Sequence, residues 1–256
     1  ARTYKVIESK ETESVFHYVD TNSSSAEIGR IAEKLKSEMI AIVGAGGTGS
    51  YVLDFIAKTP VAEIHIWDAD RFLQHNAFRS PGAASIDELL EQPLKVARLA
   101  AIYSRMHRNI IAHEEFIDPA NIPSFEGFTA VFVCIDKGSV KKPLIENLEI
   151  AGITYLDAGM GVEIVDDSLI GTLRVTTGTS DFGAPIHERG RITFHDTADE
   201  DIYDSNIQIA ELNAMNAALA VIKWKKLVGF FNVVVGEHNT LYTINDNLLH
   251  NDDVDD

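Results

Sequence analysis

From residue 39 onward, short apolar runs rich in β-branched residues alternate with longer amphipathic stretches. This alternation predicts repeated strand–helix–strand units, in which parallel strands form one sheet covered by helices on both faces. The expected fold class is α/β: a doubly wound, mainly parallel, Rossmann-like sheet with a C-terminal strand extension. The strands of the parallel part are expected at residues 39–43, 63–67, 110–113, 130–134 and 154–156.

The segments between these strands have helical periodicity and recognisable ends. Thr59-Pro60 ends a helix over 50–58, and the capping box Ser85-Ile86-Asp87-Glu88 starts another. Residues 178–205 form a long polar region, which is uncommon unless it serves a site. A loop is predicted at 21–25, further helices near 26–35, 94–106, 139–151 and 206–228, and extended segments at 168–177, 233–235 and 240–244.

Composition and charge limit the classes of function. Residues 1–38 are polar and mixed and form an expected N-terminal appendage, whereas 39–256 can make one domain with a sizeable core. The formal net charge of −17 opposes binding to nucleic acid, and no apolar run has membrane-spanning length. Cys134 is the only cysteine, so no intrachain disulfide and no zinc are expected, and the default location is cytoplasmic.

The first chemical signal is the run from Ile40 to Ser50, where an apolar strand enters a glycine turn that should open a helix. Gly44 allows the tight turn, Gly46 lets the backbone approach a phosphate, and Gly49 permits close packing of the helix. The free N–H groups of the helix N-terminus favour an anion. A phosphorylated ligand is therefore expected, although the glycines alone do not separate an ATP site from a dinucleotide site.

Charged residues at later strand ends narrow this choice. Asp68 follows the second expected strand, where an acid normally meets the ribose hydroxyls. Asp136 ends the fourth expected strand, on the same rim of the sheet as the glycine turn. Between these two acids lie Asp70, His75, Asn76, Arg79 and Lys95, residues that a nicotinamide-dependent oxidoreductase does not need.

Together these residues resemble the HesA/MoeB/ThiF family, the adenylating fold shared with ubiquitin-activating enzymes, over roughly residues 39–245. The family has a GxGGxGS turn, two acids at a strand end, an asparagine and an arginine beyond them, a lysine on the next helix and a strand-end aspartate. The matching residues here are Gly44, Gly46, Gly47, Gly49, Asp68, Asp70, Asn76, Arg79, Lys95 and Asp136.

The resemblance implies ATP and Mg²⁺. The position of Asp68 implies a contact with the ribose, and those of Asn76, Arg79 and Lys95 imply contacts with the triphosphate. Asp136 would hold the metal, and Arg79, Lys95 and Asp136 would together form the catalytic set. The implied activity is ATP-dependent adenylation of the C-terminal carboxylate of a ubiquitin-like or sulfur-carrier protein, by a homodimer.

The chain also departs from the family pattern. Relatives with a nucleophilic cysteine form a thioester or persulfide, but Cys134 lies at the end of a strand expected to be buried. The adenylate is therefore expected to pass to a downstream protein or small molecule. Arg30 is a candidate for an arginine donated across the dimer, and Arg174, Arg189 and Arg191 for contacts with a flexible substrate tail. Peptide adenylation, a non-catalytic partner subunit and a nicotinamide-dependent oxidoreductase are the alternatives.

Overall fold

A computed structural model describes residues 6–12, 14–25, 28–118, 120–180, 182–194, 207–234 and 236–251. Its centre is an eight-stranded sheet with the order β3-β2-β1-β4-β5-β6-β7-β8. The strands from β3 to β5 in this order are parallel, and the remaining pairs are antiparallel. The bounds are Met39–Val43 (β1), Glu63–Trp67 (β2), Ile110–His113 (β3), Ala130–Val133 (β4), Thr154–Val165 (β5), Ser168–Gly178 (β6), Asn239–Thr243 (β7) and Leu248–Asn251 (β8).

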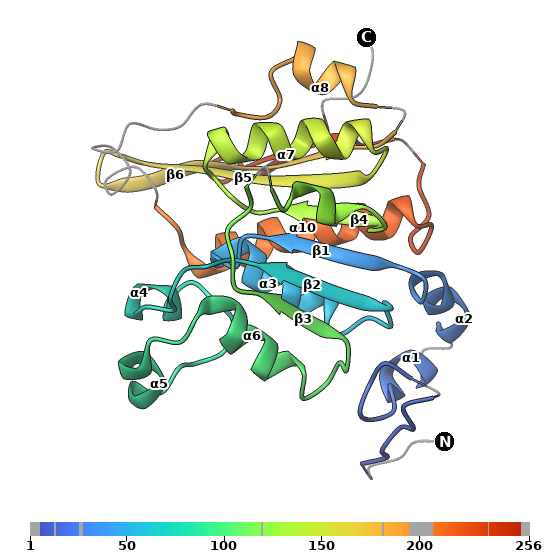
Figure 1. Ribbon diagram of the computed structural model, residues 1–256. Coiled ribbons are helices and arrows are strands. Elements are labelled where there is room, and N and C mark those ends of the chain that lie inside the picture. Colours follow the sequence, from blue (N-terminus) through green and yellow to red (C-terminus); the bar gives the residue numbers. More distant parts are fainter. Residues whose placement is uncertain are drawn as a thin grey trace.

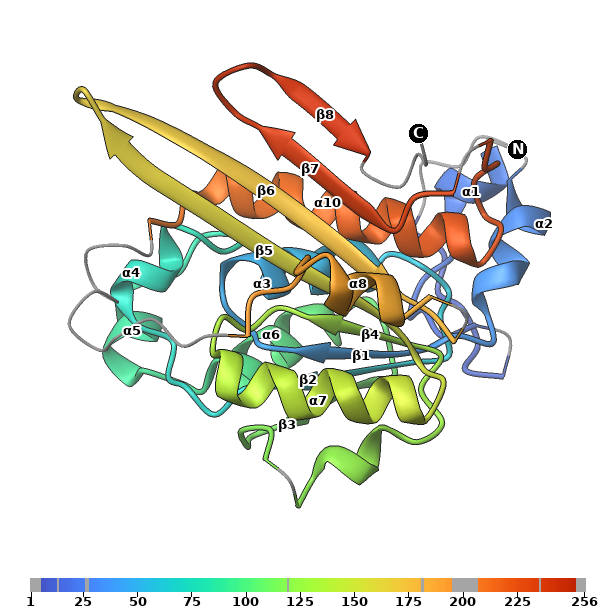
Figure 2. The same ribbon diagram turned by 90° about the horizontal axis from the view of Figure 1, so that it is seen from above.

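Helices cover both faces of the sheet, as the views from two directions show (Figures 1 and 2). One hydrophobic cluster contains side chains of α3, α6 and α10, and the other contains side chains of η2, α7 and α8. The helices are α1 (Thr21–Ser25), α2 (Gly29–Ala32), η1 (Glu33–Leu35), α3 (Gly47–Ile56), α4 (Gln74–Ala77), α5 (Ile86–Glu91), α6 (Lys95–Tyr103), η2 (Ile122–Phe125), α7 (Gly138–Ile150), α8 (Ala184–Glu188) and α10 (Ala210–Leu227).

Strand β1 shows why the chain folds into two layers of helices around one sheet. Ile40 and Ile42 belong to one hydrophobic cluster, whereas Ala41 and Val43 belong to the other. Successive side chains of a strand point to opposite faces, so an apolar strand needs a cover on each side. The doubly wound, mainly parallel α/β fold expected from the sequence is thereby confirmed.

The strand order fixes where a ligand can bind. Strand β1 lies between β2 and β4. After β1 the chain therefore adds β2 and β3 on one flank of β1, and it then crosses over to add β4 on the other flank. In open α/β sheets, ligands bind outside the carboxyl ends of the strands at such a switch point. The residues that follow Val43, Trp67 and Val133 meet at this edge.

Outside the parallel strands, several boundaries differ from those predicted. Residues 21–25 form helix α1 rather than a loop, and β5 continues to Val165 because β6 pairs with it antiparallel along its length. Strand β8 was not expected, and Val233 and Val234 lie outside the strands. Helix α10 begins at Ala210, while 195–206 and Val235 lie outside the described residues.

The described residues before β1 contact the domain at a buried histidine. Phe16 packs edge-on against His107, and the Leu35 side chain joins the core cluster on the α3 face. His107 is fully buried, its Nε2 donates to the Val61 carbonyl at 3.0 Å, and its Nδ1 accepts from the Asn109 N–H at 3.2 Å. This pattern fits only the neutral ring.

We expect this histidine to make the fold sensitive to acid. Burial lowers the pKa of His107 below the ordinary histidine value, against a smaller opposite effect of the Val61 carbonyl. The unfolded chain therefore binds the proton more readily, and stability falls as the pH drops below about 6.5. Urea unfolding should show that His107→Gln is destabilising at pH 8 and less so at pH 5.5. An effect of equal size at both pH values would contradict the prediction, and the exposed His250→Gln variant is the control.

Candidate active site

The glycine turn joins β1 to α3 at the switch point. Gly44 has a φ of +95°, a conformation that favours glycine, and its N–H donates to the Trp67 carbonyl at 2.9 Å. Gly46 precedes the first turn of α3, and a Cβ added there would meet nothing within 4 Å. The backbone here can therefore be approached closely from the cavity, beside the N-terminus of a helix that favours anions.

Asp68 braces this turn from the end of β2. Its Oδ2 accepts from the Ala45 N–H at 2.8 Å, and its Oδ1 accepts from the Asp70 N–H at 2.8 Å. The residue is only 8% exposed, so the carboxylate fixes two loops at once while still lining the cavity. Asp70 in turn binds Lys95, with 2.6 Å between Oδ2 and Nζ, and the same Nζ lies 3.6 Å from Asp68 Oδ2.

Arg79 brings a second cation to the cavity. Its guanidinium is half-buried, and no described residue accepts a hydrogen bond from its buried Nε. Burial lowers the pKa of Arg79, while Asp136 acts in the opposite direction. The pKa of His75 is lowered by burial and then by Arg79 and Lys95, as expected beside two cations. An anion would satisfy a buried donor of this kind.

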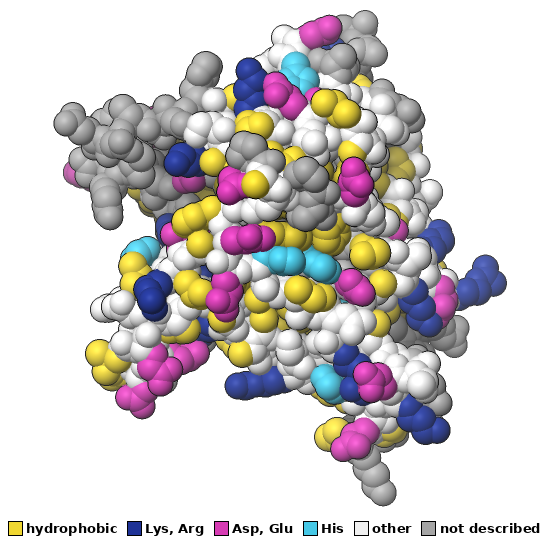
Figure 3. Space-filling model, in the orientation of Figure 1, with side chains coloured by type: hydrophobic (Ala, Val, Ile, Leu, Met, Phe, Trp, Pro, Cys, Tyr) yellow, Lys and Arg dark blue, Asp and Glu magenta, His cyan; other side chains and the backbone are white. Residues whose placement is uncertain are grey.

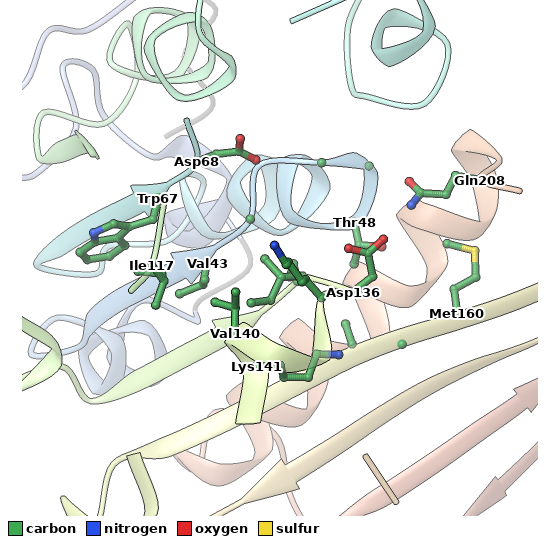
Figure 4. A pocket seen from close by; sticks show the side chains of 18 of the residues that line it. Val43, Thr48, Trp67, Asp68, Ile117, Asp136, Val140, Lys141, Met160 and Gln208 are labelled. Carbon is green, nitrogen blue, oxygen red and sulfur yellow. The ribbon is translucent and has the colours of Figure 1, made fainter. Parts of the chain in front are cut away.

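Asp136 follows β4 and points toward Thr48 at the start of α3, as Figure 4 shows. Within the described ranges, no group of three or more His, Cys, Asp or Glu side chains is placed to hold a metal ion. A nucleotide-bound Mg²⁺ needs only one or two carboxylates besides phosphates and water. The exposed carboxylate of Asp136 fits that requirement.

These groups surround one cavity of about 1080 Å³ (Figure 4). Its size suits a nucleotide together with part of a second substrate. Two of the expected site residues do not line it. Gly49 packs against the Gly44 carbonyl, and buried Asn76 accepts from the Leu73 N–H at 2.9 Å. The expected residues that do line it are Gly44, Gly46, Gly47, Asp68, Asp70, Arg79, Lys95 and Asp136.

The chain is similar to known proteins in both sequence and fold. The model of one protein family, the ThiF family, matches residues 22–163, which is more than half of the 256 residues. The chain belongs to the ThiF family. Members of this family are ATP-dependent adenylyltransferases, so the family assignment makes the chain an adenylyltransferase-type enzyme rather than a nicotinamide-dependent oxidoreductase.

Solved structures share the fold of this ThiF-family chain at low sequence identity. PaaA has a TM-score of 0.66 and 16% identity, over 86% of this chain and 74% of that chain. E. coli MccB with AMPCPP and MccA has a TM-score of 0.67 and 16% identity, over 91% of this chain and 71% of that chain. E. coli tRNA N6-threonylcarbamoyladenosine dehydratase, TcdA, in complex with ATP has a TM-score of 0.57 and 18% identity, over 81% of this chain and 92% of that chain. No curated protein sequence matches the chain.

The structure places two residues at the ThiF-family site that the sequence did not predict there, Lys141 and Asp157. Lys141 of α7 and Arg174 of β6 both line the cavity, and each contacts Asp157 of β5. Only Arg174 had been considered, as a contact for a substrate tail. A charged residue inside the apolar strand Tyr155-Leu156-Asp157 was the available signal, because a buried charge requires partners.

The other arginines considered for the substrate lie elsewhere. Arg189 and Arg191 do not line the cavity, and Arg191 is only 6% exposed. Arg30 is exposed on α2, and a role across a dimer stays a prediction. On the face shown in Figure 3, Lys and Arg side chains are scattered among acidic ones, without a continuous basic patch in its described part.

Cys134 of this ThiF-family chain is unsuited to be a nucleophile. Burial, with a smaller contribution from Asp157, raises the pKa of its thiol to about 12. The thiolate is the reactive form, and it is essentially absent at neutral pH when the pKa is this high.

Among the described helices, none is both long and apolar enough to cross a membrane.

Proposed function

We propose that the chain binds ATP in this cavity and uses it to activate the C-terminal carboxylate of a ubiquitin-like or sulfur-carrier protein as an acyl-adenylate. One observation carries the proposal: Arg79, Lys95 and Asp136 line the same cavity as Gly44 and Gly46 at the carboxyl edge of the sheet. Family membership supports the reaction type, and the cavity volume of about 1080 Å³ supports a nucleotide with a second substrate beside it.

The reaction needs charge compensation more than proton transfer. A C-terminal carboxyl group has a pKa of about 3.5 and is ionised at neutral pH. One of its oxygens attacks the α-phosphorus of ATP, and the bond from that phosphorus to the pyrophosphate oxygen breaks. The products are the acyl-adenylate and pyrophosphate, and no general base is required.

The residues are assigned by what they can offer to each part of ATP. Asp68 faces the ribose, and the N-terminus of α3 beside Gly46 and Gly47 receives phosphate oxygens. Arg79 and Lys95 neutralise the anionic charge that opposes the attack and stabilise the departing pyrophosphate. Asp136 would hold Mg²⁺, which supplies further neutralisation of phosphate charge when bound.

The adenylate is proposed to leave the enzyme without a thioester on this chain. Cys134 is the only cysteine, and burial keeps its thiol protonated. The acyl group must therefore be accepted by a nucleophile on a downstream protein or a small molecule. We also propose a homodimer and, from the single reduced cysteine, a cytoplasmic location.

ATP–pyrophosphate exchange tests this function. Labelled pyrophosphate should enter ATP only when a small β-grasp carrier ending in glycine is present, and a carrier lacking its last residue should be inactive. Exchange with short peptides but with no folded carrier would favour peptide adenylation. ATP binding without exchange in any mixture would contradict the proposal and favour a non-catalytic partner subunit.

A further inference from the structure

A buried ion cluster lies in the wall of the cavity formed by α7, β5 and β6. Asp157 is fully buried, and its Oδ1 lies 2.9 Å from Lys141 Nζ. Its Oδ2 accepts from Arg174 Nη2 at 2.6 Å. The two cations lower the pKa of Asp157 despite the opposite effect of burial, Arg174 more than Lys141. The cluster thus holds two positive charges and one negative charge.

The fold holds the Arg174 guanidinium in one place. Nη1 donates to Thr176 Oγ1 at 2.6 Å, and Thr176 Oγ1 donates to Asn239 Oδ1 at 2.7 Å. A Cβ at Gly159 would lie 2.5 Å from Arg174 Nη2, so the guanidinium rests directly on the glycine backbone. A cation fixed in this way loses little conformational freedom when it binds an anion.

Both cations have hydrogen-bond donors left over to bind an anion in the cavity. A guanidinium has five N–H donors and an ammonium group has three. Arg174 donates one contact to Asp157 and one to Thr176, and Lys141 makes one contact with Asp157. The side chains are 16% and 5% exposed, and both line the cavity. The cluster therefore offers a nearly dry site with a net charge of +1.

The position of this site suggests which anion it receives. In Figure 4, Asp68 lies on one side of the cavity and Lys141 on the other. The phosphates of the proposed ATP would lie on the side of the cavity formed by Arg79, Lys95 and the start of α3. Around Arg174 the wall carries no further charge and consists of small or apolar residues and one threonine, which suit a slim, uncharged chain rather than a nucleotide: Ala158, Gly159, Met160, Gly161, Thr172 and Leu241.

We propose that Lys141 and Arg174, held by Asp157, bind the ionised C-terminal carboxylate of the protein substrate and position it for attack on ATP. The inference rests on the function proposed above and adds a subsite to it. One carboxylate balances the net charge of the cluster, and charge-assisted hydrogen bonds are the strong ones in a dry site. Between the two cations, the carboxylate keeps one oxygen directed at the nucleotide.

Kinetics of ATP–pyrophosphate exchange with the glycine-ending carrier test this subsite. Arg174→Gln should raise the KM for the carrier about tenfold or more, as expected for a lost hydrogen bond to a charged group. The KM for ATP should stay within twofold, and Arg174→Lys should recover part of the loss because it restores the charge. Arg105→Gln removes the same charge from an exposed position after α6 and should change neither constant.

The outcomes separate this proposal from the proposed function. If the wild-type chain supports no exchange, the function itself fails and the subsite fails with it. If the wild-type chain is active, and Arg174→Gln either changes nothing or raises both KM values equally, only the subsite is wrong. An equal increase would indicate a contact with ATP phosphate or a purely structural tie between β5 and β6.

A binding measurement distinguishes a direct contact from a structural effect. Calorimetry should show that the wild-type chain binds the carrier about tenfold tighter than the same carrier with a C-terminal amide. Arg174→Gln should lose most of this preference, because only Lys141 then remains to bind the carboxylate. This variant leaves Asp157 paired with Lys141 alone, so its unfolding temperature should fall, and the binding comparison is made at a temperature where the variant is folded. A preference for the free acid that is undiminished in Arg174→Gln would overturn the proposal.

Discussion

Arg79→Ala should lower the rate of acyl-adenylate formation by about 10³ to 10⁵, the range reported for phosphate-clamping arginines. Arg79 lines the cavity, and its buried Nε has no acceptor among the described residues, so an anion is what this donor lacks. The loss should appear in kcat more than in the KM for ATP, because charge on the departing pyrophosphate develops in the transition state. Carrier-dependent pyrophosphate exchange measures both constants.

The matched control for this prediction is Arg71→Ala. Arg71 is exposed in the same loop region and donates to the Gln92 carbonyl at 2.8 Å, but it does not line the cavity. We expect exchange within about threefold of the wild type for a residue that touches no substrate. Circular dichroism should show a native fold for both variants. Normal adenylate formation by Arg79→Ala would remove Arg79 from the mechanism.

Gly49→Ala should have the second large effect, in this case on folding. A Cβ at this position would lie 1.8 Å from the Gly44 carbonyl oxygen and 3.3 Å from the Cys134 Cβ. The nearest atom belongs to backbone, so α3 or β1 must shift. The expected cost is about 3 kcal/mol or more, a large part of the stability of an ordinary domain. Chemical denaturation and the yield of folded protein measure it.

Gly46→Ala separates this packing requirement from nucleotide binding. A Cβ there would meet no atom within 4 Å, and the φ of −73° is ordinary for alanine. We expect unchanged stability, together with an affinity for ATP lowered about tenfold or more because the methyl group occupies space that a phosphate needs. Stable protein from Gly49→Ala, or unaltered ATP affinity of Gly46→Ala, would show that these glycines serve other purposes.

The sequence predicted the parallel part of the fold well because its strands are buried on both faces. The bounds of β1, β2 and β3 are those expected from the apolar runs. The prediction ended β5 at residue 156, whereas the strand continues to Val165. Beyond Asp157 the strand is more exposed and contains Gly159 and Gly161, so only its antiparallel partner β6 defines it.

The same distinction applies to the site. Arg79, Lys95 and Asp136 could be predicted because a family resemblance carries residues that lie at fixed places along the chain. The cluster of Lys141, Asp157 and Arg174 could not, since it joins one helix to two strands and becomes visible only when these elements pack. The buried positions of Gly49 and Asn76 likewise depend on tertiary contacts rather than on spacing.

The match to the family ends at residue 163, yet the glycine turn, proposed above to bind phosphate, is held from beyond that point. Helix α10 packs against α3, and Asn213 occupies the space that a Cβ of Gly47 would need. The same side chain accepts a hydrogen bond from Thr48 Oγ1 at 2.9 Å. A fragment cut at the family boundary would lack this support, so any chimera or excised unit built around the nucleotide site has to extend at least through Leu227.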